Sequence, residues 1–443
     1  MKGIKNIKRK IFQYRYFLFD IFTYNVFLFI FLNVLDLASN IRNLFFYYQI
    51  LWYFISYLLG IYNQNLINDY SFVKKRLVKI LLNLFISVNF SSLIILILFS
   101  SINLNDLLIN IRFLSVLSFV SYLSQILFYF YIKKYFKISG KWLFVGREST
   151  FKYISKTNRL LFYNYDIDYF PDLEDIKEIN YKVYYGIIID DDDLINKELN
   201  NQKINLKKII IYNYQKWIEF YFYSIPGNFI NKESLIYNLN LPDRISIELR
   251  IKRLSDILLS IIILILATPL IIFFSILIFL EDLNTPFYSQ IRTGLDEKEF
   301  KIWKLRSMKI DSEDNGPQWS RKDDPRITKV GNFIRRTRID ELPQLISVIS
   351  GNMSLIGPRP ERPEIDKLLL SKIENYTLRY QIKPGLSGWA QVKYPYGSSI
   401  EDSKIKLGYD LFYIYNYSIW LDFKILLETI RVILNAKNAI PKQ

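Results

Sequence analysis

The stretch RRTRIDELPQLISVISGNMSLIGPRPERP, residues 335–363, carries the densest chemical pattern in the chain. It contains two adjacent carboxylates, Asp340 and Glu341, four arginines between residues 335 and 359, and a Pro-Arg-Pro sequence centred on Arg359. Arginine binds phosphate oxygens through a planar, forked guanidinium. A divalent cation with oxygen ligands can bridge a carboxylate to a pyrophosphate. The stretch therefore predicts a site that handles phosphates together with a divalent metal.

The two carboxylates are expected at the start of a helix, because a proline such as Pro343 is tolerated in a first helical turn. Backbone N–H groups and the helix dipole favour anions there, and Arg335 and Arg338 add positive charge. An ionised aspartate in this place could ligate Mg²⁺ or attack phosphorus. For an Asp-Glu pair alone, a capped surface helix would be the simpler interpretation. The combination with the arginines favours a site.

Composition predicts a membrane protein with water-exposed domains. Apolar residues make up 51% and aromatic residues 17% of the 443 residues, and they fall in long runs. The net charge of +16 would suit nucleic acid, anionic lipid or anionic substrates. Because apolar runs accompany the charge, we expect a lipid bilayer and phosphate substrates, and no nucleic acid. The sequence has no cysteine and no histidine, which excludes Cys/His zinc sites and triads that use imidazole as base.

Four apolar windows are long enough to cross a bilayer, which takes about 20 residues. They lie near Tyr16–Leu35, Leu44–Ile61, Leu81–Ile102 and Leu114–Ile132. Lysine and arginine gather before the first window, between the second and third, and after the fourth. The positive-inside rule then places both ends of the group in the cytoplasm. We predict a four-helix transmembrane bundle over residues 1–138.

Residues 139–246 predict a small α/β domain with a mostly parallel sheet. Its β-rich runs are KWLFVGR, LFYNYDI, VYYGIIID and KKIIIYN. The first run ends at Gly146, but GREST follows in place of the G-x-G-x-x-G of a dinucleotide-binding turn. A degenerate Rossmann-like spacer or a dimerisation module is therefore favoured over nucleotide binding. The acidic run Asp190–Asp193 could bind a metal, although a solvated loop after a strand is the simpler interpretation.

A further apolar segment, Leu254–Leu280, opens the third predicted domain, residues 247–443. If straight, it would span a bilayer, but Pro269 lacks a backbone donor and kinks a helix. A full crossing would carry the arginine-rich stretch out of the cytoplasm and break the charge rule. We therefore predict a re-entrant membrane hairpin over residues 254–280, bent at Thr268–Pro269. A Pro-kinked fifth span is the alternative.

The segments on either side of the two carboxylates add further candidates. FKIWKLRSM, residues 300–308, alternates like a strand and offers Lys301, Lys304 and Arg306 as phosphate contacts. Near the end of the chain, Ile419–Lys437 has apolar residues at helical spacing. It suits an amphipathic helix on a membrane or a helix of the core. The fold class expected is α plus α/β, with a mostly helical third domain.

Several motifs, in order over residues 250–438, resemble those of the bacterial sugar transferase family. They are RIKRLSDILLS, FYSQIRTG, FKIWKLRSM, DPRITKVGNFIRRTRIDELPQL, GNMSLIGPRPERPE and KPGLSGWAQV. Its members are polyprenol-phosphate hexose-1-phosphate transferases that start exopolysaccharide, O-antigen and related glycans. The resemblance implies transfer of a sugar-1-phosphate from a UDP-sugar to undecaprenyl phosphate, with release of UMP. YPYG at Tyr394–Gly397 is most similar to the exopolysaccharide branch.

The resemblance also implies roles for single residues. Asp340 falls on the family's nucleophile, which forms a covalent phosphoglycosyl-aspartate, and Glu341 falls on the acid that assists the metal or the acceptor phosphate. Mg²⁺ is expected at these two acids. Arg335 and Arg359 fall on arginines that grip phosphates. Arg338 is a further substrate-binding candidate, as is the glutamine of the GWAQV motif, Gln391.

The long members of the family imply a multi-pass protein of the bacterial inner (cytoplasmic) membrane, with its catalytic domain facing the cytoplasm, and suggest a homodimer. Lys393 departs from the pattern, because many relatives have asparagine after GWAQV, so contacts there stay open. One alternative is a transferase with many more spans and no covalent intermediate. Another is a membrane scaffold that only binds anionic lipid. The sequence does not identify the sugar.

Overall fold

The computed structural model describes residues 19–23, 25–26, 39–59, 61, 79–88, 115–116, 118–128, 130, 141–160, 166–171, 184–190, 210–225, 247–313, 324–394, 397 and 399–434. The chain forms two compact units, Met1–Ser139 and Gly140–Gln443. The division into three domains, with boundaries at 138/139 and 246/247, stays a prediction.

The described part of the first unit is helical. Helix α3 spans Ser39–Leu58, and two shorter apolar helices span Lys79–Val88 and Ser118–Phe128. Asn83 donates a hydrogen bond of 2.6 Å to the hydroxyl of Ser56, so a buried amide joins two of these helices. The helices overlap the second, third and fourth predicted spans. Much of the four spans lies outside the described residues, and the transmembrane bundle stays a prediction.

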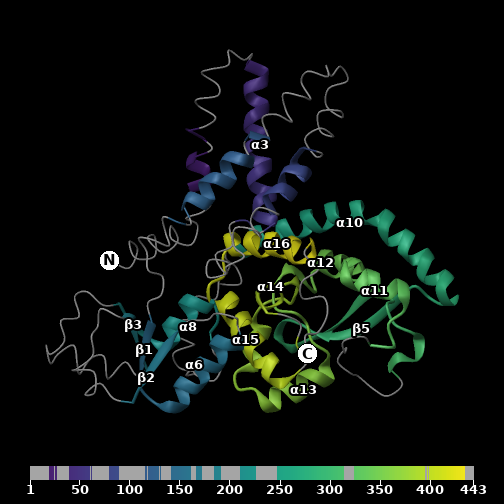
Figure 1. The fold of residues 1–443 in the computed structure, drawn as a ribbon. Helices are drawn as coiled ribbons and strands as arrows, with labels where there is room; N and C mark the ends of the chain where they lie inside the picture. Colours follow the sequence, from purple (N-terminus) through teal and green to yellow (C-terminus); the bar gives the residue numbers. More distant parts are fainter. Residues whose placement is uncertain are drawn as a thin grey trace. The chain divides into compact units, whose positions relative to one another are not determined.

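A four-stranded parallel sheet opens the second unit, as the sequence predicts. Its strand order is β2-β1-β3-β4, and Figure 1 shows helices α6 and α8 beside it. Trp142, Phe144 and Trp217 are buried between the sheet and these helices. The second predicted strand run was placed too early, because β2 begins at Ile167, its last residue. The bounds are β1 Lys141–Val145, α6 Glu148–Leu160, β2 Ile167–Phe170, β3 Tyr184–Ile189, β4 Ile210–Asn213 and α8 Tyr214–Phe222.

Asp190, expected in a solvated loop, is instead buried at the ends of β1 and β3. Its Oδ2 atom accepts hydrogen bonds from Arg147 Nε at 2.7 Å and from Thr150 Oγ1 at 3.0 Å. Gly146 has a φ of +142°, and a Cβ there would lie 2.3 Å from the Asp190 Cβ. The carboxylate of the chain itself therefore fills the edge of the sheet where a nucleotide phosphate would bind. The solvated-loop interpretation is wrong for Asp190, and Asp191–Asp193 lie outside the described residues.

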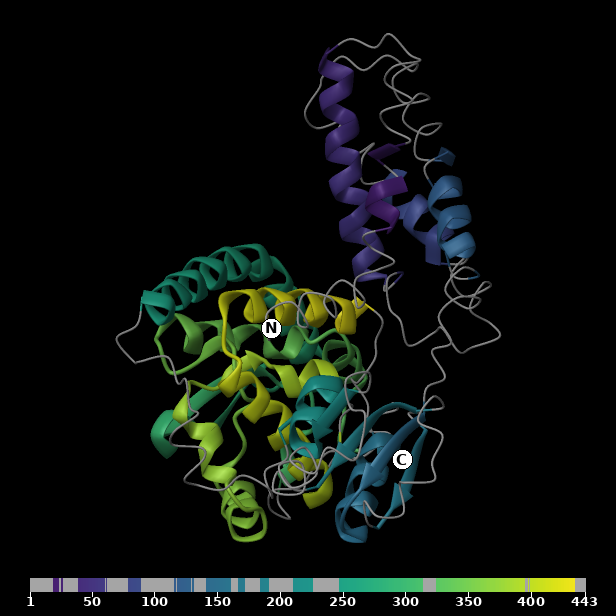
Figure 2. The ribbon, with the colours of Figure 1, turned by 90° about the vertical axis from the view of Figure 1, so that its left-hand side faces the viewer.

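Helix α10, Ile247–Asp282, is the one helix among the described residues that is long and apolar enough to cross a membrane. It continues through Pro269, so the structure has a single curved helix in place of the two arms of the predicted hairpin. Pro269 lacks an N–H, and the Thr268 hydroxyl donates to the Leu264 carbonyl at 2.7 Å. Both features bend a helix. Figures 1 and 2 show α10 as an arch.

Both ends of α10 are fixed to the same part of the protein, the described residues 283–434, called here the C-terminal module. Near the first end, Arg253 donates to the carbonyls of Val348 and Ile349 at 2.6 and 2.7 Å. At the other end, Glu281 accepts a 2.9 Å hydrogen bond from the backbone of Lys329. A straight helix of this length would hold its ends roughly 50 Å apart. The two attachments support entry and exit on one face, while insertion into a membrane stays a prediction.

The C-terminal module is mostly helical, with two small sheets. Strands β5 and β6 pair antiparallel, and β7 and β8 pair parallel. Trp389 and Tyr409 are fully buried in its core, and the Trp389 indole donates to the Tyr223 carbonyl at 3.0 Å. The bounds are β5 Phe287–Thr293, β6 Glu299–Leu305, α11 Lys329–Arg336, η8 Ile339–Gln344, α12 Leu345–Ile349, β7 Ser354–Ile356, α13 Pro363–Lys372, η9 Tyr376–Gln381, β8 Gly385–Ser387, α14 Trp389–Lys393, α15 Ile400–Tyr415 and α16 Ile419–Leu434, with short 3₁₀ turns Leu295–Glu297 and Ile310–Glu313.

Candidate active site

The two carboxylates lie in the first turn of η8, a 3₁₀ helix that leads into α12. Arg338, the residue before this helix, has a φ of +59°, a conformation that costs free energy in a residue with a side chain. Asp340 and Glu341 are only 8% and 7% exposed. Strand β6 and helix α10 both pack against η8. The sequence predicted a helix start here, and the structure confirms it.

Glu341 is held in its ionised form by two arginines. Its Oε1 atom accepts hydrogen bonds from Arg359 at 2.7 Å and from Arg338 at 3.1 Å. Burial alone would raise the pKa of Glu341, but the charges of Arg359, Arg338 and Lys304 bring that pKa well below its usual value. Glu341 is therefore a fixed anion that orients Arg359 next to the site.

Asp340 differs from its neighbour in having an oxygen without a protein partner. Its Oδ1 atom is buried and accepts no hydrogen bond within the part of the chain that the structure describes. Burial raises the pKa of Asp340 to about 6, helped by the charge of Glu341 and opposed by Lys304, Arg338 and Arg335. Loss of hydration lowers the pKa of Lys304 to about 7. A buried carboxylate oxygen with no donor is costly, so this atom is suited to a ligand that the protein alone does not supply.

The Pro-Arg-Pro turn that carries Arg359 is pressed against strand β8. Gly385 donates to the Pro358 carbonyl at 2.8 Å, and Gly357 donates to the Ser387 carbonyl at 2.9 Å. A Cβ on Gly385 would lie 2.0 Å from the Gly357 nitrogen, so glycine is required at this crossing. The backbone beneath Arg359 is therefore fixed before any substrate binds.

A buried arginine, Arg379, supports the same turn from below. It donates to the Arg359 carbonyl at 2.7 Å and to Asp410 at 3.1 Å. Its guanidinium lies over the ring of Tyr376, with the ring centre 4.9 Å away. Burial raises the pKa of Asp410 to about 6 against the opposing charge of Arg379. The sequence analysis missed Arg379, because its partners lie up to 31 residues away in the chain.

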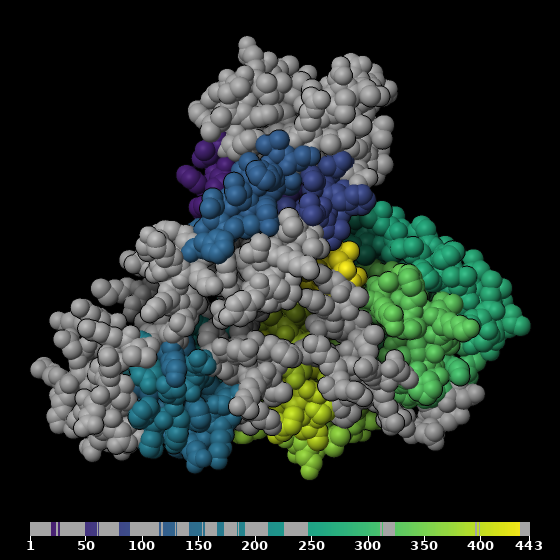
Figure 3. Space-filling model, viewed as in Figure 1, coloured from purple at the N-terminus to yellow at the C-terminus, as the bar shows by residue number. Residues whose placement is uncertain are grey.

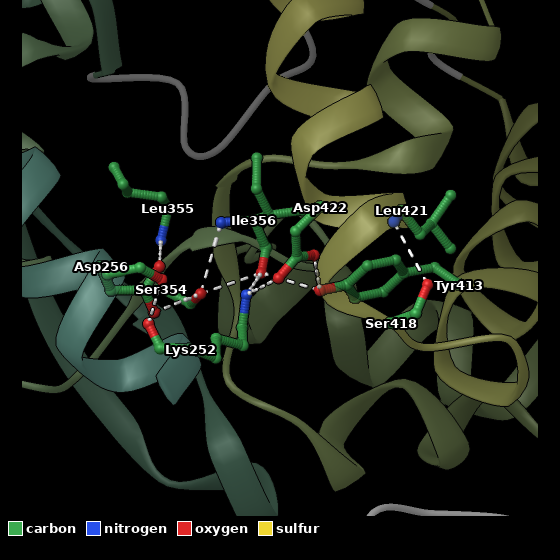
Figure 4. A network of polar contacts seen from close by, with 10 residues as sticks. Lys252, Asp256, Ser354, Leu355, Ile356, Tyr413, Ser418, Leu421 and Asp422 are labelled. Atoms are coloured by element: carbon green, nitrogen blue, oxygen red, sulfur yellow. Dashed lines mark hydrogen bonds and ion pairs between the residues drawn. The ribbon is translucent and has the colours of Figure 1, made fainter. Parts of the chain in front are cut away.

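A polar network ties α10 and α16 to strand β7, which leads into the turn (Figure 4). Lys252 pairs with Asp422 at 2.7 Å and donates to the Ile356 carbonyl at 3.1 Å. Asp256 accepts hydrogen bonds from the Ser354 hydroxyl at 2.8 Å and from the Leu355 backbone at 3.2 Å. Figure 4 shows the lysine pointing between strand β7 and α16. Helix α10 thus helps to fix strand β7, which leads into the Arg359 turn.

Comparison with known proteins identifies the family to which this chain belongs. The profile of the family described as bacterial sugar transferase matches residues 247–436. A UDP-glucose:undecaprenyl-phosphate glucose-1-phosphate transferase of Caulobacter vibrioides is 36% identical over 198 residues, which are 44% of this chain and 74% of that protein. The chain belongs to the bacterial sugar transferase family.

Two longer relatives match in the same part of this sugar transferase. The UDP-N-acetylgalactosamine-undecaprenyl-phosphate N-acetylgalactosaminephosphotransferase of Aeromonas hydrophila is 43% identical over 189 residues, 43% of this chain and 45% of its own. The UDP-glucose:undecaprenyl-phosphate glucose-1-phosphate transferase of Escherichia coli is 40% identical over 182 residues, 41% of this chain and 39% of its own. The match thus spans less than half the length of these two relatives.

The structure separates the three cations predicted in residues 300–308 of this sugar transferase, two of which lie on β6. Lys304 lies near the two carboxylates, whose charges partly offset the lowering of its pKa by burial. Lys301 lies on the opposite face of the strand, exposed, with its ammonium 4.7 Å from the centre of the Trp303 ring. The geometry therefore supports Lys304 as a phosphate contact and places Lys301 away from the carboxylates.

Arg306 is a structural residue in this geometry. Both of its terminal nitrogens pair with Asp282, and its Nε donates to the Thr285 carbonyl at 2.8 Å. All three of its donor nitrogens have partners at the end of α10, and its contact with phosphate stays a prediction. Arg335 lies in the last turn of α11, and its positive charge opposes the rise in the pKa of Asp340. Gln391 lies on α14, which packs against α15 and α16, and its role in substrate binding stays a prediction.

The residues at η8 fit a magnesium ion. No group of three or more His, Cys, Asp or Glu residues that could hold a metal occurs in the described ranges. Mg²⁺ is commonly bound by one or two carboxylates that share it with substrate phosphates and water. The unpartnered, buried Oδ1 of Asp340 offers such an oxygen. Glu341 supplies a second carboxylate beside it, and Mg²⁺ at this dyad is taken up in the proposal below.

Proposed function

We propose that this sugar transferase moves a sugar-1-phosphate from a UDP-sugar to undecaprenyl phosphate, releases UMP, and forms a covalent intermediate on Asp340. The observation that supports the proposal most is the difference between two neighbouring carboxylates. Glu341 is occupied by Arg359 and Arg338, whereas the Oδ1 of Asp340 is buried and has no donor among the described residues. The relatives named as undecaprenyl-phosphate sugar phosphotransferases match over this region.

The reaction has two displacement steps at one phosphorus. In the first, an Asp340 oxygen bonds to the phosphorus next to the sugar, and the bond from that phosphorus to UMP breaks. In the second, a phosphate oxygen of undecaprenyl phosphate bonds to the same phosphorus, and the bond to Asp340 breaks. The product is an undecaprenyl diphosphate sugar, and the carboxylate is regenerated.

The cations around the dyad stabilise the charge that moves during these steps. Arg359 reaches the site from a fixed turn and brings its positive charge beside Glu341, where it would stabilise substrate phosphates. Lys304 and Arg335 add positive charge near Asp340. Mg²⁺, held by Asp340 and Glu341, would neutralise phosphate charge when bound. Because both phosphate substrates are already ionised, the reaction needs no histidine.

We propose further that the protein is a multi-pass protein of the bacterial cytoplasmic membrane, with residues 247–434 on the cytoplasmic side. Helix α10 lies at the surface (Figure 3), and its exposed apolar residues support membrane contact there; they include Leu258, Ile262, Leu266, Phe273 and Leu280. The glycan that the product starts is of the exopolysaccharide or O-antigen type. A homodimer, expected from the resemblance, is tested by the mass of the protein in detergent.

The direct test is release of UMP by the purified full chain. Wild type is expected to release UMP continuously from the correct UDP-sugar only with undecaprenyl phosphate and Mg²⁺ present. Asp340→Asn keeps the shape of the side chain and removes its nucleophilic charge, so turnover should disappear while the protein still folds. Wild-type turnover in this variant would exclude the covalent step.

A further inference from the structure

The motif FYSQIRTG, residues 287–294, has no part in the reaction described so far. All of it except the final glycine forms strand β5, which pairs antiparallel with β6. In this pairing Tyr288 lies directly opposite Lys304. Opposite residues share a face of the sheet, and so do residues two apart on one strand. Gln290 and Arg292 therefore lie on the same face of the hairpin as Lys304.

The guanidinium of Arg292 is held by an uncharged partner. Its Nη2 atom donates to the Oε1 atom of Gln290 at 2.7 Å, and the Gln290 amide in turn donates to the Tyr288 hydroxyl at 3.1 Å. The Nε atom of Arg292 is buried and has no hydrogen-bond partner among the described residues. A neutral amide fixes the guanidinium without cancelling its charge, and the buried Nε leaves one donor for a ligand.

Arg292 lies next to the Arg359 turn. The backbone N–H of the following residue, Thr293, donates to the Glu361 carbonyl at 3.1 Å, so the end of β5 is tied to the segment just after the turn. Burial lowers the pKa of Arg292 to about 10; the charge of Glu361 opposes this, and those of Arg359 and Arg362 add to it. An anion bound between these arginines would stabilise the charged form of Arg292.

Arg292 lies farther from the nucleophile than Lys304 does. Along β5 it is four positions beyond the partner of Lys304, roughly 13 Å, and its bond to Gln290 brings the guanidinium back toward Lys304. The charge of Lys304 acts on the pKa of Asp340, whereas that of Arg292 is not among the main ones. In an in-line displacement the attacking oxygen and the leaving phosphate lie on opposite sides of the phosphorus. Arg292 is therefore placed for the leaving side.

We propose that Arg292 binds the phosphate that leaves with UMP, and that Gln290 is the residue that positions Arg292 for it. The proposal rests on the function proposed above, because that phosphate belongs to the UDP-sugar. A glutamine suits the positioning role, since it orients the guanidinium and leaves its charge for the substrate. A carboxylate in the same place would orient the guanidinium equally well but would neutralise it.

The test measures binding of UMP to the purified full chain in detergent with Mg²⁺ by isothermal titration calorimetry, with uridine as the ligand that lacks phosphate. Arg292→Gln removes the charge, and Gln290→Glu keeps the hydrogen-bond acceptor while neutralising the arginine. Each should weaken UMP binding about tenfold, as expected for loss of a charge-assisted hydrogen bond, and leave uridine binding unchanged. The matched control is Lys298→Gln, which removes an exposed lysine from the turn of the same hairpin and should bind UMP as wild type does.

Gln290→Glu separates phosphate binding from a merely structural role. If Arg292 only stabilises the hairpin, the introduced carboxylate pairs with it, the melting temperature is kept or raised, and UMP binding is unchanged; that result would overturn the proposal. Unchanged UMP affinity in Arg292→Gln would also overturn it, as would an equal loss of uridine binding. UMP binding involves no covalent step, so wild-type turnover in Asp340→Asn would remove the proposed nucleophile and leave this phosphate site standing.

Discussion

Arg359→Gln tests the role of the fixed Pro-Arg-Pro turn. The guanidinium donates to Glu341 at 2.7 Å and is held from behind, through its own carbonyl, by Arg379. Glutamine keeps much of the side-chain length and removes the charge. Glu341 would then keep only the 3.1 Å contact from Arg338, and its pKa would rise toward the usual range.

The size of the effect follows from the burial of the contact. A hydrogen bond to a charged group contributes about 1.5–3 kcal/mol. The Arg359 side chain is 33% exposed and that of Glu341 is 10% exposed, so solvent screening favours the lower half of this range. Arg359 would make a bond of the same kind to a substrate phosphate in the transition state, and losing about 1.5–2 kcal/mol there corresponds to a fall of roughly 10- to 30-fold in kcat/KM. The assay is UMP release with saturating Mg²⁺ and a range of UDP-sugar concentrations.

Arg336→Gln is the matched control, because it removes an exposed arginine from the same arginine-rich segment. No hydrogen bond from its side chain is seen among the described residues, and it is expected to stay within twofold of wild type. Arg359→Lys should fall between the two, since it keeps the charge and loses the fork. If Arg359→Gln also stays within twofold, or if the control falls as far, the turn does not act as described.

Lys304→Gln should lower kcat/KM at least tenfold more than Lys301→Gln, because only the first lies near the dyad; equal effects in the UMP assay would contradict this. Lys252→Met leaves a buried Asp422 without its cation and should cost about 3–5 kcal/mol of stability. Thermal unfolding in detergent would show it, with partial recovery when Asp422→Asn is added; an unchanged melting temperature would refute it.

The sequence predicted local features that depend on near neighbours. The parallel sheet, the helix at Asp340 and the apolar length of α10 follow from alternation, spacing and composition. The bend predicted at Thr268–Pro269 lies inside one continuous helix, because α10 lacks only one N–H at Pro269 and the Thr268 hydroxyl donates to the Leu264 carbonyl in the preceding turn. The attachments that bring both ends of α10 to one module span 48 to 96 residues, so no local pattern shows them.

The residues of the candidate site also fall into two groups, those that short motifs predict and those that only the fold reveals. Asp340, Glu341 and Arg359 stand in short motifs, and their adjacency could be predicted from those motifs. Arg306 and Lys304 are cations of the same short segment and look alike in the sequence. In the structure Arg306 pairs with Asp282, 24 residues earlier, whereas Lys304 lies near the dyad. No short motif marks Arg379, because its two partners, the Arg359 carbonyl and the Asp410 carboxylate, are brought next to it only by the fold.

The most direct test of the central claim is the intact mass of the purified protein after mixing with a panel of UDP-sugars and Mg²⁺, without undecaprenyl phosphate. The account predicts that one donor adds the mass of a sugar phosphate to wild type, with one equivalent of UMP released, and adds nothing to Asp340→Asn. If no donor leaves an adduct while transfer to undecaprenyl phosphate still proceeds, the reaction is a direct displacement and Asp340 is not its nucleophile.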